Sequence, residues 1–203
     1  MDRAVLDTLR AMEARGFKTH AFETASEMRE FILNSIEPQA SVGFGGSVTS
    51  EELGLYDALA ARGNPVHFHW KVPPENRAAT LERAHSADVY IMSSNAVTSD
   101  GVLLNIDGNG NRVGALVCGP KTVFIVLGIN KLVKSREEAM ARVKNIACPA
   151  NARRLGLKTP CALTGKCTDC RSLQRMCNYI VWTEAPRRAA TVHICIAACQ
   201  LGF

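Results

Sequence analysis

Four cysteines lie within one short segment of this chain, in the order Cys161, Cys167, Cys170 and Cys177. Thiolate sulfur is a preferred ligand of zinc and of iron-sulfur clusters, so the spacing C-x5-C-x2-C-x6-C predicts a metal site. Structural zinc sites usually combine two C-x2-C pairs, and only Cys167 and Cys170 form one here. The spacing therefore favours a [4Fe-4S] cluster, whose corners are separate ligand points. Zinc is the alternative, and a metal-free set of redox thiols is a third interpretation.

The other cysteines divide into two kinds. Cys148 precedes the cluster and is a candidate substitute ligand, so we take residues 148–177 as the cysteine-rich segment. Cys118, Cys195 and Cys199 lie in or near apolar runs and are expected to be small buried residues. The first residues lack the apolar core of a secretory signal, which predicts a cytoplasmic protein. In that reducing compartment we expect thiols or metal ligands rather than disulfides.

A glycine-rich loop is the second candidate site. It reads Gly43-Phe-Gly-Gly-Ser-Val-Thr49, follows a short apolar run and precedes a predicted helix start. Backbone amides in such a turn bind anions, so Gly45 and Gly46 with the hydroxyls of Ser47 and Thr49 are predicted to hold an anionic ligand. A tight turn between a strand and a helix also needs glycine for purely structural reasons. Both interpretations stay open.

Polar residues further along the chain complete this predicted ligand site. Asn130 and Lys131 follow the apolar run Thr122–Leu127, and ligands of parallel sheets bind at the carboxyl ends of strands. Lys131 would supply a positive charge to the site, and Asp100 is the best candidate for a general base. An aspartate before glycine also commonly bonds its own backbone in a turn, so that alternative is kept. The expected polar anchors are Asn95, Thr98 and Asn105.

Histidines and basic residues allow further alternatives. His67 and His69 alternate along a predicted strand, where they are either a metal-binding pair or, as we favour, a polar strand face. The basic side chains around the cysteines form a solvated face, neutralise a thiolate cluster or dock an acidic partner. Nucleic-acid binding is disfavoured because aromatic residues make up only 6% and none interleave with the basic ones. These basic residues are Arg153, Arg154, Lys158, Lys166, Arg171 and Arg175.

The elements that must position these groups follow from length and periodicity. The 203 residues are enough for one domain with one core, and no apolar run approaches the roughly 20 residues of a spanning helix. Strands are predicted over residues 17–22, 40–44, 65–70 and 88–92, with helices before and between them. This alternation predicts an α/β fold with a mainly parallel sheet flanked by helices.

The alternation then breaks. Residues 101–106 and 112–117 are predicted as the two strands of an inserted hairpin, because Asp-Gly and Asn-Gly pairs between them are strong turn formers. Residues 122–127 are expected to be a central strand buried on both faces. Residues 135–146 form a predicted helix with a capping box, and a separate short basic helix follows over 149–157. Residues 179–183 and 191–197 are two further predicted strands.

A family resemblance rests on several of these blocks. The run Asn95-Ala-Val-Thr-Ser-Asp-Gly101, continuing to Arg112, and the Val126-Leu-Gly-Ile-Asn-Lys131 run closely resemble the lactate-utilisation (LUD) domain family. The glycine loop and the Thr164–Cys170 block fit it too, so the likeness covers nearly the whole chain. It implies a fold similar to the sugar-phosphate isomerase and CoA-transferase group. It also implies bacterial oxidation of lactate to pyruvate beside iron-sulfur subunits.

The chain resembles the short subunit type, because it lacks the tandem ferredoxin cysteines of the longer iron-sulfur subunit and carries a single four-cysteine segment instead. The resulting prediction is an iron-sulfur-binding enzyme or redox subunit that acts on a small hydroxy or keto acid. The alternative is a non-catalytic iron-sulfur or zinc module that docks a partner oxidoreductase. The expected partners are a small anionic metabolite, iron-sulfur oxidoreductase subunits and a second copy of the chain, without nucleic acid or membrane insertion.

Overall fold

The main sheet has six strands in the order β1-β10-β7-β4-β2-β3, and all five pairings are parallel. The structure, a computed structural model, describes residues 1–203. In sheet order the strands are β1 (Lys18–Phe22), β10 (Thr191–Ala197), β7 (Thr122–Gly128), β4 (Val89–Met92), β2 (Val42–Phe44) and β3 (Val66–Phe68). The predicted α/β class with a mainly parallel sheet is confirmed.

Helices cover both faces of this sheet. Side chains of β7 alternate between the two faces, with Val123 and Ile125 in one core and Phe124 and Val126 in the other, as a strand buried on both sides requires. One face is covered by α1 (Arg3–Ala14) and α6 (Asn111–Cys118), and the other by α2 (Ala25–Ser35) and α4 (Leu55–Arg62). The remaining helical elements of this part are α3 (Val48–Glu52), η1 (Pro74–Asn76) and α5 (Arg77–His85).

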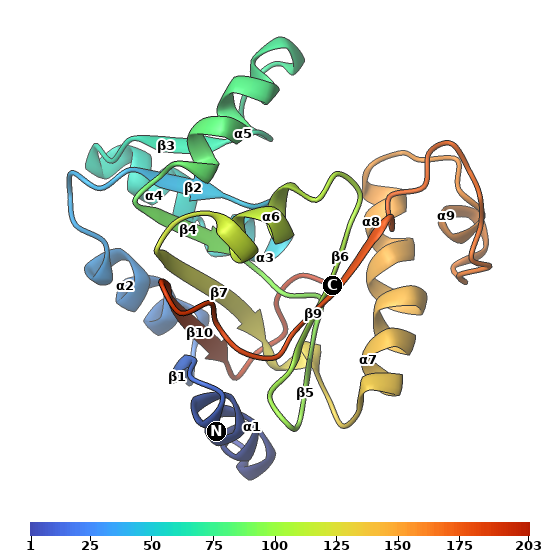
Figure 1. Cartoon of the computed structure of the whole chain (residues 1–203), viewed down its shortest axis with the longest axis horizontal. Helices are drawn as coiled ribbons and strands as arrows, with labels where there is room; N and C mark the ends of the chain where they lie inside the picture. Colours follow the sequence, from blue (N-terminus) through green and yellow to red (C-terminus); the bar gives the residue numbers. More distant parts are fainter.

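A second, smaller sheet lies to one side of the main sheet, next to α7 (Arg136–Arg142) and α8 (Cys148–Arg154) (Figure 1). Its order is β8-β5-β6-β9, with β5 and β6 joined as an antiparallel hairpin. A third apolar core lies between this sheet and α7, and contains Leu104, Ile106, Ala139 and Val143. The strands are β5 (Ala96–Thr98), β6 (Leu103–Asp107), β8 (Leu132–Val133) and β9 (Tyr179–Thr183), and the turn η2 (Ile129–Lys131) precedes β8.

The predicted hairpin was wrong in its second arm. Residues 112–117 are not a strand but most of α6, which begins after Gly110 in the left-handed conformation at φ 75°. The helix buries Val113 and Leu116, three residues apart, whereas a strand would bury alternate residues. The true hairpin is β5–β6, and its turn contains Asp100 and Gly101. A short apolar run does not distinguish the strand period of two residues from the helix period of about 3.6, which explains the error.

The helix after β8 is longer than predicted. It runs from α7 (Arg136–Arg142) through the π-helical turn η3 (Val143–Ala147) into α8 (Cys148–Arg154), where two separate helices were expected. Pro149 lies in the first turn of α8, where a missing amide hydrogen is tolerated, and the wider π turn before it accommodates the change of register. A short helix, α9 (Pro160–Thr164), follows, and residues 165–178 have no regular secondary structure. None of the helices is both long and apolar enough to cross a bilayer.

Candidate ligand-binding site

A cavity of about 810 Å³ lies at the carboxyl ends of β2, β4 and β7, the edge at which parallel sheets bind ligands. The segments that follow these strands contribute Gly46–Thr49, Ser93–Asn95 and Lys131 to its lining. Another wall comes from α8 and the cysteine-rich segment, through Cys148 and residues 174–176. The cavity therefore joins two parts of the chain that the sequence presented as separate candidate sites.

The glycine loop contributes shape to the cavity more than free amides. A Cβ atom at Gly46 would lie 2.8 Å from the ring of Trp70, so only glycine lets the indole pack here. The amide of Gly45 is already used, since it donates to the carbonyl of Ile91 at 2.9 Å. The Ser47 hydroxyl caps α3 by accepting from the amide of Ser50 at 3.2 Å. The structural interpretation of this loop thus holds for Gly45 and Ser47, while Gly46 and Ser47 also line the cavity.

Lys131 is the most unusual residue of the cavity, because its side chain is buried without an opposite charge. Only 3% of the residue is exposed, and Nζ donates to Thr49 Oγ1 and to Ser93 Oγ, both at 2.8 Å. Burial, followed by the charges of Arg142 and Arg112, lowers the pKa of Lys131 to about 7, although Glu52 opposes the shift. Near neutral pH the amine is therefore divided between its charged and neutral forms.

Below the cavity lies a buried ion pair between Arg112 and Asp107. Arg112 Nε and Nη2 donate to Asp107 Oδ1 at 2.9 and 2.6 Å, and Nη1 donates to the carbonyl of Ser93 at 2.9 Å. Asp107 Oδ2 also accepts the amide of Val113 at 3.0 Å, and Asn95 Oδ1 accepts from Arg112 at 2.7 Å. This network fastens β6 to α6 and to the end of β4. It positions the cavity floor rather than offering free groups to a ligand.

The rim of the cavity carries an excess of positive charge. Arg77, Arg154 and Arg175 line it, and the guanidinium of Arg154 lies 4.1 Å from the ring centroid of Trp70. His69 also lines the cavity, and its pKa is lowered by burial and by the two arginines nearest to it. With Lys131 and Arg112, five basic side chains of lysine or arginine face two acidic ones, Glu51 and Asp107. The cavity is suited to an anion.

The LUD domain family matches residues 6–196 of the chain. This chain belongs to the LUD domain family. A similar solved structure is the crystal structure of a DUF162 family protein from Deinococcus radiodurans, with 13% identity and a TM-score of 0.56 over 96% of each chain. At that identity the likeness shows a shared fold alone. No curated protein matches the chain. The family predicted from the Asn95–Lys131 blocks is thus confirmed.

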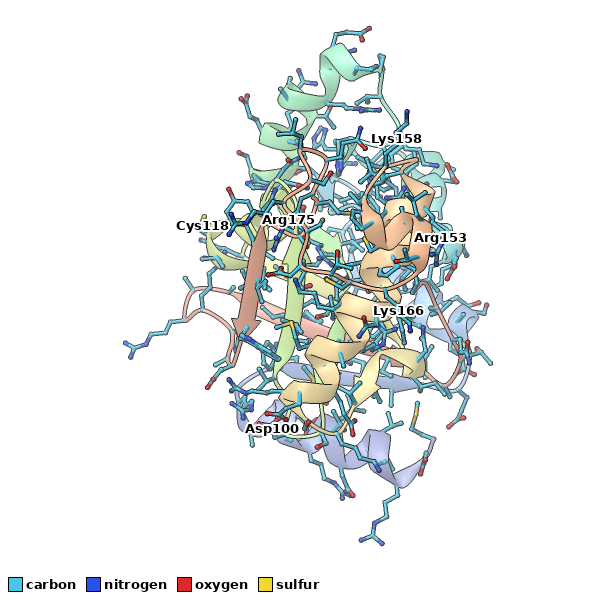
Figure 2. All side chains as sticks on the ribbon, turned by 90° about the vertical axis from the view of Figure 1, so that its right-hand side faces the viewer. Asp100, Cys118, Arg153, Lys158, Lys166 and Arg175 are labelled. Atoms are coloured by element: carbon cyan, nitrogen blue, oxygen red, sulfur yellow. The ribbon has the colours of Figure 1, made fainter.

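Several predicted residues of this LUD domain lie outside the cavity. Asp100 sits in the β5–β6 turn, where its half-exposed carboxylate accepts from Arg15 Nη2 at 3.0 Å and from Thr98 Oγ1. The hydrogen bond from Thr98 lowers the pKa of Asp100, which makes it a weaker base. Figure 2 places Asp100 well apart from Arg175 and Lys158. We therefore remove Asp100 from the proposed catalytic set, since the alternative of a turn aspartate accounts for its contacts.

The other outlying residues have structural contacts. Thr98 Oγ1 accepts the amide of Val102 at 3.0 Å and so closes the same turn. Asn130 fastens the C-terminal residues, because its Oδ1 accepts the amide of Leu201 at 3.1 Å and its Nδ2 donates to the carbonyl of Gly202 at 3.2 Å. Asn105 is fully buried with no hydrogen bond to its side-chain amide. Of the predicted anchors, Asn95 alone reaches the cavity lining.

The cysteines of this LUD domain are partly brought together. Interaction with the neighbouring Cys148 thiol lowers the pKa of Cys177, and the charges of Lys144 and Arg175 favour the Cys177 thiolate further. Cys161 Sγ lies 3.3 Å from Thr159 Oγ1, and Cys167 Sγ accepts the amide of Asp169 at 3.4 Å. No three cysteine, histidine or acidic side chains are grouped closely enough to hold a metal ion. The donor chemistry fits a soft metal or cluster, and Cys148 with Cys177 is the pair already in place.

Sequence reasoning missed the cationic rim. Arg77, Arg154 and His69 come from α5, α8 and the residue after β3, and each is distant in sequence from the glycine loop. The predicted strand over residues 65–70 contained His69, whereas β3 ends at Phe68, so His69 lies at the strand end where ligands of parallel sheets bind. No local pattern identifies the arginines, because their convergence depends on how α5 and α8 pack.

Proposed function

We propose that this LUD domain protein binds a small carboxylate, a hydroxy or keto acid, in the cavity at the strand ends and acts on it as an enzyme or redox subunit. The observation that carries the proposal is Lys131, a buried amine with no acidic partner in a cavity whose rim is cationic. A buried ammonium without a counter-ion is unfavourable by itself, and a bound carboxylate would supply the missing charge.

The rim supports the same ligand class. Arg77 and Arg154 line the cavity without an acidic partner, although Arg154 Nε donates to Asn151 Oδ1 at 3.0 Å. Guanidinium groups bind carboxylates through paired hydrogen bonds. Trp70 supplies an apolar face beside them. The arginines at the rim and the buried amine of Lys131 at the floor suit a ligand that has a carboxylate at one end and a polar oxygen at the other.

We propose further that the cysteine-rich segment holds a [4Fe-4S] cluster, with zinc as the alternative. Cys177 and Cys148 would serve as two ligands, and Cys161, Cys167 and Cys170 are the candidates for the others. Cys148 and its neighbours in α8 line the cavity, which supports a cluster beside the bound acid. When bound, such a cluster transfers single electrons or polarises a ligand oxygen. The chain's own residues hold and orient the acid: Lys131 at the floor, and Arg77 and Arg154 at the rim.

Ligand binding is tested by thermal unfolding with lactate, pyruvate, larger 2-oxo acids and their amides. At a ligand concentration a hundred times Kd, binding stabilises the folded state by about 2.7 kcal/mol, which raises Tm. Arg154→Ala should weaken binding by about tenfold or more, because a charged hydrogen bond contributes about 1.5–3 kcal/mol. Arg153→Ala is the matched control, since Arg153 is exposed on the same helix and does not line the cavity. Equal shifts for acids and amides would contradict carboxylate binding.

The cluster is tested separately, by metal analysis and the visible spectrum of anaerobically purified protein. Iron with sulfide and broad visible absorption is expected, and colourless protein with one zinc would replace the cluster by the alternative. Cys177→Ser should reduce the iron content. Cys118→Ser should leave it unchanged, because Cys118, which was wrongly predicted to be buried, is an exposed thiol at the end of α6. An unchanged iron content in Cys177→Ser would contradict the ligand set.

A second candidate function is a non-catalytic module that docks an acidic iron-sulfur oxidoreductase subunit. Its supporting observation is the surface of the cysteine-rich segment, where Leu163 is 80% exposed and Leu173 is fully exposed. Arg153, Lys158, Lys166 and Arg175 lie on the same side of the molecule (Figure 2). Docking without turnover predicts flat melting temperatures across the acid panel, which is the outcome that separates it from the first proposal.

A further inference from the structure

We propose that Lys131 forms a covalent imine with the ketone or aldehyde carbonyl of a 2-oxo acid bound in the cavity. The inference rests on the proposed function and narrows it, because it selects keto acids from the class of small hydroxy and keto acids. Four features carry it: the burial of the amine, its two hydroxyl partners, the absence of an acidic partner and its place in the cavity lining.

The contacts of Nζ leave it free to react. A lysine amine has three donors in its charged form, and two of them are directed to the hydroxyls of Thr49 and Ser93. Hydroxyl oxygens accept these hydrogen bonds without holding the proton as a carboxylate would. Lys71 shows the contrast: its amine lies on the rim side of the glycine loop and pairs with Glu51 at 3.0 Å, which raises its pKa.

The charged groups around Nζ favour the neutral amine, which is the nucleophilic form. Arg142 of α7 and Arg112 of α6 both add positive charge to the site. Arg112 is paired with the carboxylate of Asp107, whereas Arg142 has no carboxylate beside it. Glu52 of α3 opposes them, and its carboxylate is engaged by the amide of Gly202 at 2.7 Å. With a pKa of about 7 for Lys131, a large fraction of the amine is neutral in the physiological range.

The step balances without an oxidant or reductant. The lone pair of Nζ attacks the carbonyl carbon, so that a C–N bond forms and the carbonyl oxygen receives a proton. Nζ loses a proton, for which the Ser93 and Thr49 hydroxyls at 2.8 Å offer a short relay to the former carbonyl oxygen. As the C–O bond breaks, the oxygen takes up a second proton from solvent and leaves as water, and the protonated imine remains. Its positive charge would be balanced by the carboxylate of the acid.

Borohydride trapping tests the imine directly. Wild-type protein is incubated with glyoxylate, pyruvate, 2-oxobutyrate or 2-oxoglutarate, reduced with sodium cyanoborohydride and digested for mass spectrometry. The expected result is a reduced adduct on Lys131 with at least one of the acids. It should exceed the adduct on Lys134 by about tenfold or more, because Lys134 is exposed to solvent and lies outside the cavity that would hold the acid. Lactate, which has no ketone or aldehyde carbonyl, should give no adduct.

The outcomes separate this inference from the proposed function. If 2-oxo acids raise Tm but no adduct forms on Lys131, the imine is wrong and carboxylate binding stands. If neither occurs, both are wrong. Mapping the adduct in wild-type protein needs no variant, so a folding defect cannot obscure the result. Lys131→Arg, which keeps a cation but has no amine of this kind, should lose the adduct while Lys134→Arg retains it.

Discussion

The cavity floor and the cysteine-rich segment enclose one cavity, but they are built differently. We define the floor as Thr49, Ser93, Asp107, Arg112 and Lys131, all of which are buried and hydrogen-bonded to one another or to strand ends. In the cysteine-rich segment no residue between 160 and 177 is buried, and residues 165–178 have no regular structure. The floor is organised by the protein alone, whereas in the segment only Cys177 lies beside another thiol, that of Cys148, and few contacts fix the remaining cysteines.

This difference separates two kinds of site. A floor with satisfied hydrogen bonds holds Lys131 in place before any ligand arrives, which is what covalent or acid-base chemistry needs. A segment of half-buried thiols would gain order from the metal proposed above, because metal binding would supply the folding energy that its own contacts do not. Substitutions that remove one interaction partner in each region should therefore cause unequal losses of stability.

The largest expected effect is on the buried ion pair. Asp107→Ala should lower the free energy of unfolding by about 3–5 kcal/mol, because it leaves Arg112 buried without its opposite charge. Chemical denaturation of the metal-free protein measures the change. The matched variant is Asp169→Asn in the cysteine-rich segment, because asparagine tolerates the φ of 47° found there. The exposed ion pairs of Asp169 with Arg175 and Lys144 that it removes should contribute less than about 1 kcal/mol. Equal losses for the two variants would remove the distinction between the regions.

The next effect is the pH dependence of stability that Lys131 causes. Its pKa is about 7 in the folded protein and 10.5 ordinarily, so between these values the unfolded chain binds more protons and stability rises with pH. Each unit of this difference corresponds to about 1.4 kcal/mol. Relative to Lys131→Met, wild-type protein should therefore gain several kcal/mol from pH 7 to pH 10.5 and change little below pH 7. A constant difference between the two across that window would contradict the buried amine.

The smallest of the three effects concerns the glycine loop. Gly46→Ala places a methyl group 2.8 Å from the Trp70 ring, and the ring must move, which should reduce stability by about 1–3 kcal/mol. Movement of Trp70 should also weaken acid binding through Arg154, which stacks on it. Gly114→Ala in α6 is the control, because its methyl group would lie 3.4 Å from His85 and alanine favours a helix. An unchanged free energy of unfolding and unchanged acid binding in Gly46→Ala would show that the loop accommodates the methyl group without moving Trp70.

Local pattern accounts for much of the fold and for part of the site. The six main strands and the apolar period of β7 were predictable because strand and helix alternate with clear turn residues. The strand-end rule placed Lys131 in the site, and the glycine turn and the polar anchors added Gly46, Ser47, Thr49 and Asn95. The cavity lining includes all five, but not Asn130, which the strand-end rule had also placed there.

The remaining site residues could not be predicted in this way. Asp100 and Asn105 belong to the same sequence block as Asn95, yet the hairpin carries Asp100 to its far end and turns Asn105 into the interior. Arg112 was predicted to lie in a strand, so its ion pair with Asp107, which depends on α6, could not be predicted. Arg77 and Arg154 reach the cavity only through the packing of distant helices, a property that short-range pattern does not contain.

The position of β10 has a consequence for synthesis of the protein. β10 lies between β1 and β7, and β1 has no other strand neighbour. Until residues 191–197 have left the ribosome, β1 has no strand partner and one edge of β7 is open, so the nascent chain exposes unpaired strands throughout synthesis of the segment from β1 to β10. Chaperone dependence and aggregation during expression should therefore be governed by how soon β10 arrives.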